Sequence, residues 1–203
     1  VKGLEISAYN CKFCPGMALA FGTSPIGAHH KEAWIIMFEL NQTVRESYGR
    51  EKAEKVIELQ RIRGGLFEYI TACRFPWIEI GWNLEHYPVY FNTVTGLNWT
   101  LDDFWKISDR IYSLMKLFWL REVPGWNRTM DHPPAAWFDP GNADTEGPIA
   151  GKVLEMDKYE SLLDHYYNIR GWDKRGIPTR KTAAALGLDN EAQKAEAYGK
   201  LED

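Results

Sequence analysis

The most regular pattern of apolar positions lies between residues 100 and 122. Apolar side chains recur there every three or four residues for five turns, which is typical of an amphipathic helix. Thr100 and Asp103 have the spacing of an approximate capping box, so we expect the helix to begin directly after Thr100. The apolar positions are Leu101, Phe104, Trp105, Ile111, Tyr112, Met115 and Phe118.

A second helical pattern covers residues 51–72. Gly64 and Gly65 interrupt it, and a glycine inside a helix costs about 1 kcal/mol relative to alanine. We therefore predict a kink or a close backbone contact at the two glycines. The pattern ends at a single cysteine, Cys73, where helix should give way to loop.

The segments that flank this helix are less regular. Residues 41–50 are polar and indicate a connection or a frayed helix. Pro76 and Gly81 bracket an aromatic turn. Residues 84–94 are a candidate for a short helix, which Pro88 is expected to break.

The C-terminal part alternates loop and helix. Residues 122–152 are rich in proline and glycine and lack a period, which predicts a long wrapping loop. Helices are expected over 157–171 and 179–187, while the charged, alanine-rich tail 189–203 is expected to fray. These patterns predict an all-α, multihelical fold with almost no strand, forming a single helical domain over residues 1–203.

Composition narrows the classes of protein to be considered. The chain has 203 residues, of which 45% are hydrophobic and 14% aromatic, enough for a substantial core and a sizeable interface. The net charge is −4 and the basic residues are dispersed, which argues against nucleic-acid binding. No membrane-length apolar run and no signal segment is apparent, so we expect a cytoplasmic protein. Val1 enters in mid-pattern, which suggests a piece of a longer chain.

Three cysteines suggest free thiols or metal ligands more than a disulfide framework. Cys11 and Cys14 form a C-x-x-C pair that is structural, metal-binding or redox-active. Tetrahedral zinc needs four ligands and a second pair is absent, although one of His29 or His30 could join the two cysteines. Cys73 is either a small buried apolar residue or a ligand.

Two adjacent histidines follow a stretch of small apolar residues. Residues 16–28 have the composition of a backbone packed tightly against a neighbour or a ligand. His29, His30 and Lys31 come directly after it. Adjacent side chains point in different directions, so at most one histidine can face a given site. The alternative for each histidine is a surface or capping role.

Four stretches, in order along nearly the whole chain, resemble the C-terminal part of the tungsten-containing aldehyde:ferredoxin oxidoreductase family. VKGLEISAYN at 1–10 resembles the family's V-K-G-L-E-x-P-A-Y-D signature. GMALAFGTSPIGAHH at 16–30 resembles G-M-x-L-x-Y-A-T-S-x-x-G-x-x-H. FNTVTGLNWT at 91–100 resembles F-N-x-V-T-G-W-D-x-T, and YYNIRGWDKRGIPT at 166–179 resembles Y-Y-x-x-R-G-W-D-x-x-G-x-P-T.

The resemblance implies an all-helical C-terminal region that helps to hold a tungsten bis-pterin of the molybdopterin type and a [4Fe–4S] cluster. An N-terminal pterin domain would lie outside this chain. The family's D-x-x-G-L-C/D motif corresponds to residues 68–73, which makes Cys73 the candidate cluster ligand and Glu68, Thr71 and Ala72 candidate pterin contacts. The match is imperfect, because Glu replaces Asp and Thr-Ala replaces Gly-Leu.

The resemblance also implies a histidine close to tungsten that donates or accepts a proton. By spacing this is His30, with His29 as the competitor, and Lys31 becomes a further pterin contact. A histidine suits proton transfer because its unperturbed pKa lies near neutral pH.

The activity implied for the full-length protein is oxidation of an aldehyde to a carboxylic acid, with ferredoxin or another electron-transfer subunit as acceptor. Two alternatives remain: reduction of an aromatic acyl-CoA ring, as in some relatives, and a non-catalytic scaffold or subunit-contact module. We expect the isolated piece to be inactive and to lack its cofactors. It should also expose apolar surface around 16–38 and 67–82, and therefore tend to form homo-oligomers.

Overall fold

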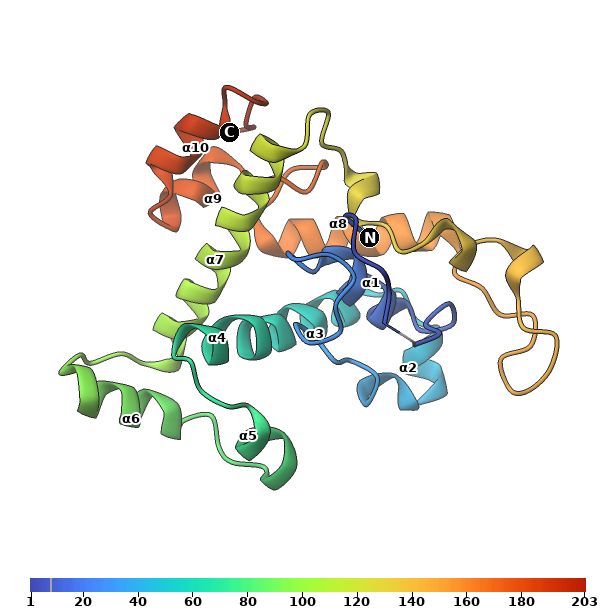
Figure 1. Cartoon of the computed structure of the whole chain (residues 1–203), viewed down its shortest axis with the longest axis horizontal. Coiled ribbons are helices and arrows are strands. Elements are labelled where there is room, and N and C mark those ends of the chain that lie inside the picture. The colour runs from blue at the N-terminus through green and yellow to red at the C-terminus, as the bar shows by residue number, and fades with distance from the viewer. Residues whose placement is uncertain (8) are drawn as a thin grey trace.

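The computed structural model describes residues 1–7 and 9–203, and Ala8 lies outside this part (Figure 1). The described residues form helices and loops, with one isolated bridge between Trp172 and Pro178, so the all-α prediction is confirmed. None of the described helices is long and apolar enough to cross a membrane. The α-helices are α1 Pro15–Thr23, α2 Gln42–Glu46, α3 Arg50–Gln60, α4 Phe67–Tyr69, α5 Phe75–Ile80, α6 His86–Thr95, α7 Leu101–Glu122, α8 Met156–Arg170, α9 Arg180–Ala185 and α10 Asp189–Ala195.

Helix α7 is the longest element, and it connects the α5–α6 end of the molecule with α9 and α10 (Figure 1). The predicted capping box is present: the backbone N–H of Thr100 donates to Asp103 Oδ2 at 2.8 Å. The apolar stripe of α7 faces inward, with Phe104 and Tyr112 almost fully buried. The sequence therefore predicted the start of this helix correctly and its buried face in part, because Phe118 is exposed whereas Leu117 and Leu120 are buried.

The double glycine lies in a π-helical segment, η2, Arg61–Leu66, that joins α3 to α4. A Cβ added at Gly64 would stand 1.9 Å from Glu32 Oε2 and 2.2 Å from the Tyr112 hydroxyl. At Gly65 it would stand 1.9 Å from Ser108 Oγ. The glycines thus let this segment approach α7 closely, as expected, and a π-bulge accommodates the irregular turn.

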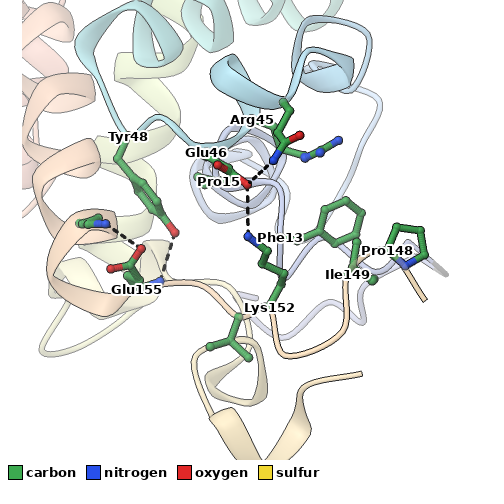
Figure 2. Close-up of a pocket in the computed structure, with 12 residues that line it drawn as sticks. Phe13, Pro15, Arg45, Glu46, Tyr48, Pro148, Ile149, Lys152 and Glu155 are labelled. Atoms are coloured by element: carbon green, nitrogen blue, oxygen red, sulfur yellow. Dashed lines mark hydrogen bonds and ion pairs between the residues drawn. The ribbon is translucent and has the colours of Figure 1, made fainter. Parts of the chain in front are cut away.

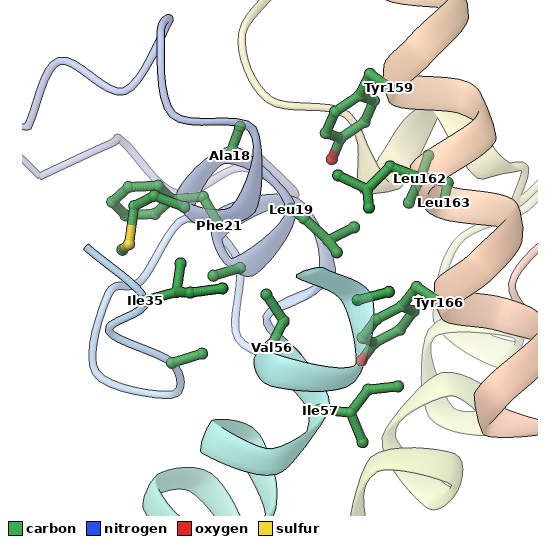
Figure 3. Packing of buried hydrophobic residues seen from close by; sticks show 14 of the residues in the cluster. Ala18, Leu19, Phe21, Ile35, Val56, Ile57, Tyr159, Leu162, Leu163 and Tyr166 are labelled. Atoms are coloured by element: carbon green, nitrogen blue, oxygen red, sulfur yellow. The ribbon is translucent and has the colours of Figure 1, made fainter. Parts of the chain in front are cut away.

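Helix α1 is buried along its whole length, at the centre of the main core (Figure 3). It packs against α3 and α8 through small and apolar side chains such as Leu19, Val56 and Tyr166. Glu39 caps its N-terminus, accepting from the N–H groups of Gly16 and Met17 at 2.8 and 2.9 Å. The expected apolar surface over 16–38 is therefore wrong for α1, because the same chain covers it.

The arm that follows Cys73 consists of α5 and α6. Both helices differ from what the sequence predicted. Helix α5 replaces the expected aromatic turn, with Gly81 in the left-handed conformation at its end. Helix α6 is continuous through Pro88, because a proline in the first turn lacks only an N–H that has no intrahelical acceptor.

The same arm carries much of the exposed apolar surface. Half of the large exposed apolar side chains in the described part of the chain lie between residues 69 and 97, so the expectation for 67–82 is confirmed. Beneath them lies a small cluster around Phe67 and Phe104. The exposed side chains are Tyr69, Phe75, Ile78, Ile80, Trp82, Val89, Tyr90, Val94 and Leu97.

The C-terminal elements follow the predicted order. The wrapping loop contains only short 3-10 turns, η3 Arg128–Asp131, η4 Ala135–Trp137 and η5 Pro140–Asn142. Helix α8 ends at Gly171 in the left-handed conformation, and Thr179 caps α9. The tail does not fray, because α10 packs on α7 and Leu201 is fully buried in an apolar cluster with Leu117 and Ile177.

A buried ion cluster ties the first residues to the wrapping loop. Asp131 pairs with Lys2 Nζ at 2.7 Å and with Lys116 of α7, and the hydroxyl of Tyr167 donates to it at 2.7 Å. Burial lowers the pKa of Lys116 to about 8, although Asp131 partly opposes this. Lys2 thus has a structural role.

Candidate functional site

The structure brings the two predicted site segments together. Lys31 Nζ lies 2.5 Å from Glu68 Oε1, so the loop that carries the histidines touches the end of the helix that leads to Cys73. Arg63 of η2, which precedes the second segment, also donates from Nε to the Lys31 carbonyl at 2.9 Å. Residues 29–31 and 68–73 therefore border one surface.

The two histidines stack on each other, with ring centroids 5.1 Å apart and planes 8° apart. His29 Nδ1 accepts from the Lys31 N–H at 2.9 Å, which fixes its ring. His30 Nδ1 lies 3.2 Å from Ser7 Oγ. The edges of Tyr9 and Trp34 contact the His30 ring, each with centroids 5.3 Å away. The rings of Tyr9 and Trp34 therefore contact His30, whereas Nδ1 of His29 accepts a hydrogen bond from the backbone of its own loop.

The surroundings of His30 favour its neutral form. Burial lowers the pKa of the imidazole, and the nearby His29, Arg63 and Arg74 lower it further. A neutral imidazole can both accept and donate a proton near pH 7. Arg63 and Arg74 were missed by the sequence reasoning, since a single arginine within a helix or at a loop gives no pattern.

The segment from Glu68 to Cys73 leaves the helix through an unusual turn. Thr71 has φ +51°, a conformation that a β-branched residue rarely adopts. It occupies the place of the glycine in the D-x-x-G-L-C/D pattern, so the glycine-type backbone is kept without the glycine. Ala72 is half-buried, and Cys73 is exposed, with its thiol available to a ligand.

Cys11 and Cys14 behave differently from Cys73. Both are buried, and burial raises the pKa of each thiol to about 12, with Glu39 adding to the effect. They are therefore protonated at neutral pH and poor metal ligands or nucleophiles. Across residues 1–7 and 9–203 no three His, Cys, Asp or Glu side chains are grouped to hold a metal ion, which contradicts the zinc hypothesis.

A cavity of about 500 Å³ lies elsewhere, between α2, the start of α8 and the loop at 148–153 (Figure 2). Its lining contains none of the predicted site residues. Two of its lysines are already paired with carboxylates: Lys152 with Glu46 at 3.2 Å and Lys158 with Glu155 at 2.8 Å. This cavity is therefore separate from the candidate site.

Comparison with known proteins found a matching family model and several curated relatives. A family model described as "Aldehyde ferredoxin oxidoreductase, domains 2 & 3" matches residues 1–188. Curated relatives named "Tungsten-containing aldehyde ferredoxin oxidoreductase" include proteins of Thermococcus kodakarensis and Pyrococcus horikoshii. Each is 26% identical over 93% of this chain, which spans 30% of the relative's length.

One solved structure shares the fold. It is entitled "Active site complex BamBC of Benzoyl Coenzyme A reductase in complex with 1,5 Dienoyl-CoA". The likeness has a TM-score of 0.56 at 20% identity and covers 74% of this chain and 22% of that one.

Proposed function

Because the chain belongs to the aldehyde ferredoxin oxidoreductase family, we propose that it forms the helical part of a tungsten-containing enzyme that oxidises aldehydes to carboxylic acids. The chain spans about a third of its curated relatives, so the site would be completed by the rest of the full-length protein. The observation that supports the proposal is the Lys31–Glu68 ion pair, which joins the loop of His30 to the segment that leads to Cys73.

The residues present fit the cofactors that the family implies. The exposed thiol of Cys73 suits an iron–sulfur cluster, which is bound by cysteine thiolates. Arg63 and Arg74 are cations that could face the phosphates of a pterin. When bound, a tungsten bis-pterin supplies two-electron chemistry and a [4Fe–4S] cluster supplies one-electron transfer.

We assign the protein's own chemistry to three groups. His30, kept neutral by its surroundings, would hold or move the substrate proton at its free Nε2, while Nδ1 lies against Ser7. Cys73 would bind the cluster as a thiolate. Lys31 and Glu68, which neutralise each other here, would orient the pterin through hydrogen bonds, together with the backbone at Thr71 and Ala72.

The remaining parts of the proposal concern organisation. We propose that residues 1–203 act as one helical domain, that ferredoxin or a similar subunit accepts the electrons, and that the protein works in the cytoplasm. The exposed α5–α6 arm supports contact with further protein.

The test uses the full-length protein produced anaerobically with tungstate. We expect Cys73→Ala to lose the [4Fe–4S] signal in electron paramagnetic resonance, while Cys14→Ala, a buried cysteine outside the site, keeps it. An intact cluster and normal tungsten content in Cys73→Ala would leave the chain as a helical scaffold.

A second candidate is reduction of an aromatic acyl-CoA ring. Tyr9 and Trp34, which pack edge-to-face with His30, favour it, because aromatic side chains can also make edge-to-face contacts with an aromatic substrate. Parallel assays of the loaded protein with an aromatic aldehyde and with an aromatic acyl-CoA plus a reductant would distinguish the two activities.

A further inference from the structure

Two arginines beside the candidate site, Arg63 and Arg74, form few contacts with the rest of the described chain. Arg63 is only 8% exposed, yet its single hydrogen bond in the described part of the chain goes to the Lys31 carbonyl. Nη1 of Arg74 is shielded from solvent, and it has no hydrogen-bond acceptor among residues 1–7 and 9–203. Neither guanidinium forms an ion pair within that set. A buried arginine is normally paired, so this arrangement calls for a partner.

The nearby carboxylates form their hydrogen bonds and ion pairs with other side chains. Glu68 is bound to Lys31 at 2.5 Å. Glu32 Oε2 accepts from the Tyr112 hydroxyl at 3.0 Å. Glu32 still favours the charged form of Arg63, but burial and the neighbouring Arg74 outweigh it and lower the pKa of Arg63 to about 10. Within the described part of the chain, Glu32 therefore offsets the burial of Arg63 and the repulsion from Arg74 only in part.

We propose that Arg63 and Arg74 together bind an oxyanion, a phosphate or carboxylate group, at the edge of the His30–Cys73 surface. A guanidinium presents a planar fork of donors that matches such groups, and two of them can hold one anion from two sides. The binding site stands on the burial and the free donors alone. Only the source of the oxyanion rests on the proposed function, and it is either a cofactor phosphate or the carboxylate of the acid product.

The site can be tested on the 203-residue chain without cofactors. Inorganic phosphate and benzoate are titrated separately, and binding is followed through the arginine Nε–H signals in ¹H–¹⁵N NMR spectra. We expect saturable shifts of Arg63 and Arg74 with at least one probe. Arg63→Gln and Arg74→Gln should each weaken binding at least tenfold, which corresponds to about 1.4 kcal/mol and is the lower end for a hydrogen bond to a charged group.

Two further variants serve as controls for anion binding. Arg50→Gln removes an exposed arginine that pairs with Glu54, and it should leave anion binding unchanged. Arg63→Lys retains the charge and should recover part of the affinity. If Arg63→Gln does not fold, Arg74→Gln carries the test, because Arg74 lies outside the core.

Each outcome has a definite meaning. Binding of phosphate but not benzoate would assign the site to a cofactor phosphate, and the reverse would assign it to the substrate acid. Absence of saturable binding, or binding that neither glutamine variant weakens, would overturn the proposal. That failure differs from failure of the oxidoreductase proposal, which depends on the cluster content of Cys73→Ala.

Discussion

Replacing Gly64 with alanine sets two physical effects against each other. Helix propensity alone predicts that Gly64→Ala stabilises the protein by about 1 kcal/mol. The structure predicts the opposite, because the new Cβ would stand 1.9 Å from Glu32 Oε2 and 2.2 Å from the Tyr112 hydroxyl. Both neighbours are buried and bonded to each other, so neither can move without loss.

The size of the loss follows from the contacts. Overpacking a buried site costs about 1–3 kcal/mol. Breaking the Tyr112–Glu32 hydrogen bond costs about 1.5–3 kcal/mol more, since the acceptor is a carboxylate. After subtracting the propensity gain, we expect Gly64→Ala to lower the free energy of unfolding by about 3 kcal/mol.

Urea denaturation followed by far-ultraviolet circular dichroism measures this change. Gly141→Ala is the matched control, because its new Cβ would meet nothing closer than 3.2 Å and the residue is exposed. We expect that control to stay within about 1 kcal/mol of the wild type. In a Tyr112→Phe background the cost of Gly64→Ala should shrink, since the shared hydrogen bond is lost only once. A Gly64→Ala protein as stable as the wild type would refute the reasoning.

Three further predictions follow. Thr71→Gly should raise the free energy of unfolding by about 0.5 kcal/mol, because relief of the left-handed strain at φ +51° slightly exceeds the added backbone entropy of glycine; denaturant unfolding checks this, and a loss of stability would contradict it. Ellman's reagent should titrate one thiol in the native protein, Cys73, and three after denaturation; rapid native reaction of Cys11 or Cys14 would disprove their burial. Stability should fall as the pH rises from about 9 to about 12, because the Cys11 and Cys14 thiols keep their protons longer when folded; Cys11→Ala/Cys14→Ala should show a shallower fall, and an equal slope would count against this cause.

The long helix and the double glycine could be predicted because both are local features. The capping box at Thr100 and the apolar stripe behind it depend on neighbours within a few residues. Pro88 was misjudged because its effect depends on where the helix begins, which no nearby residue marks. The small apolar stretch at 16–23 was expected to face a partner, but a segment that packs tightly looks the same in sequence whether its neighbour is α3 and α8 or another protein.

The sequence predicted only part of the candidate site. Residues 29–31 and 68–73 stand out by motif, but their contact through Lys31 and Glu68 is a tertiary fact. Arg63 and Arg74 belong to no motif, and their significance comes from burial without a partner. The roles of His29, His30, Glu68, Thr71, Ala72 and Cys73 in catalysis and cofactor binding stay predictions.

The arm formed by α5 and α6 gives the molecule uneven local stability. It is held to the rest of the described chain mainly by the small cluster around Phe67 and Phe104, whereas α1, α3 and α8 share a large one. Segments with few buried contacts open more readily than the global fold. Cys73 directly precedes this arm, so a group bound there would stabilise the packed arm against local unfolding and slow amide hydrogen exchange in α6. Order in the arm would then report whether the site is filled.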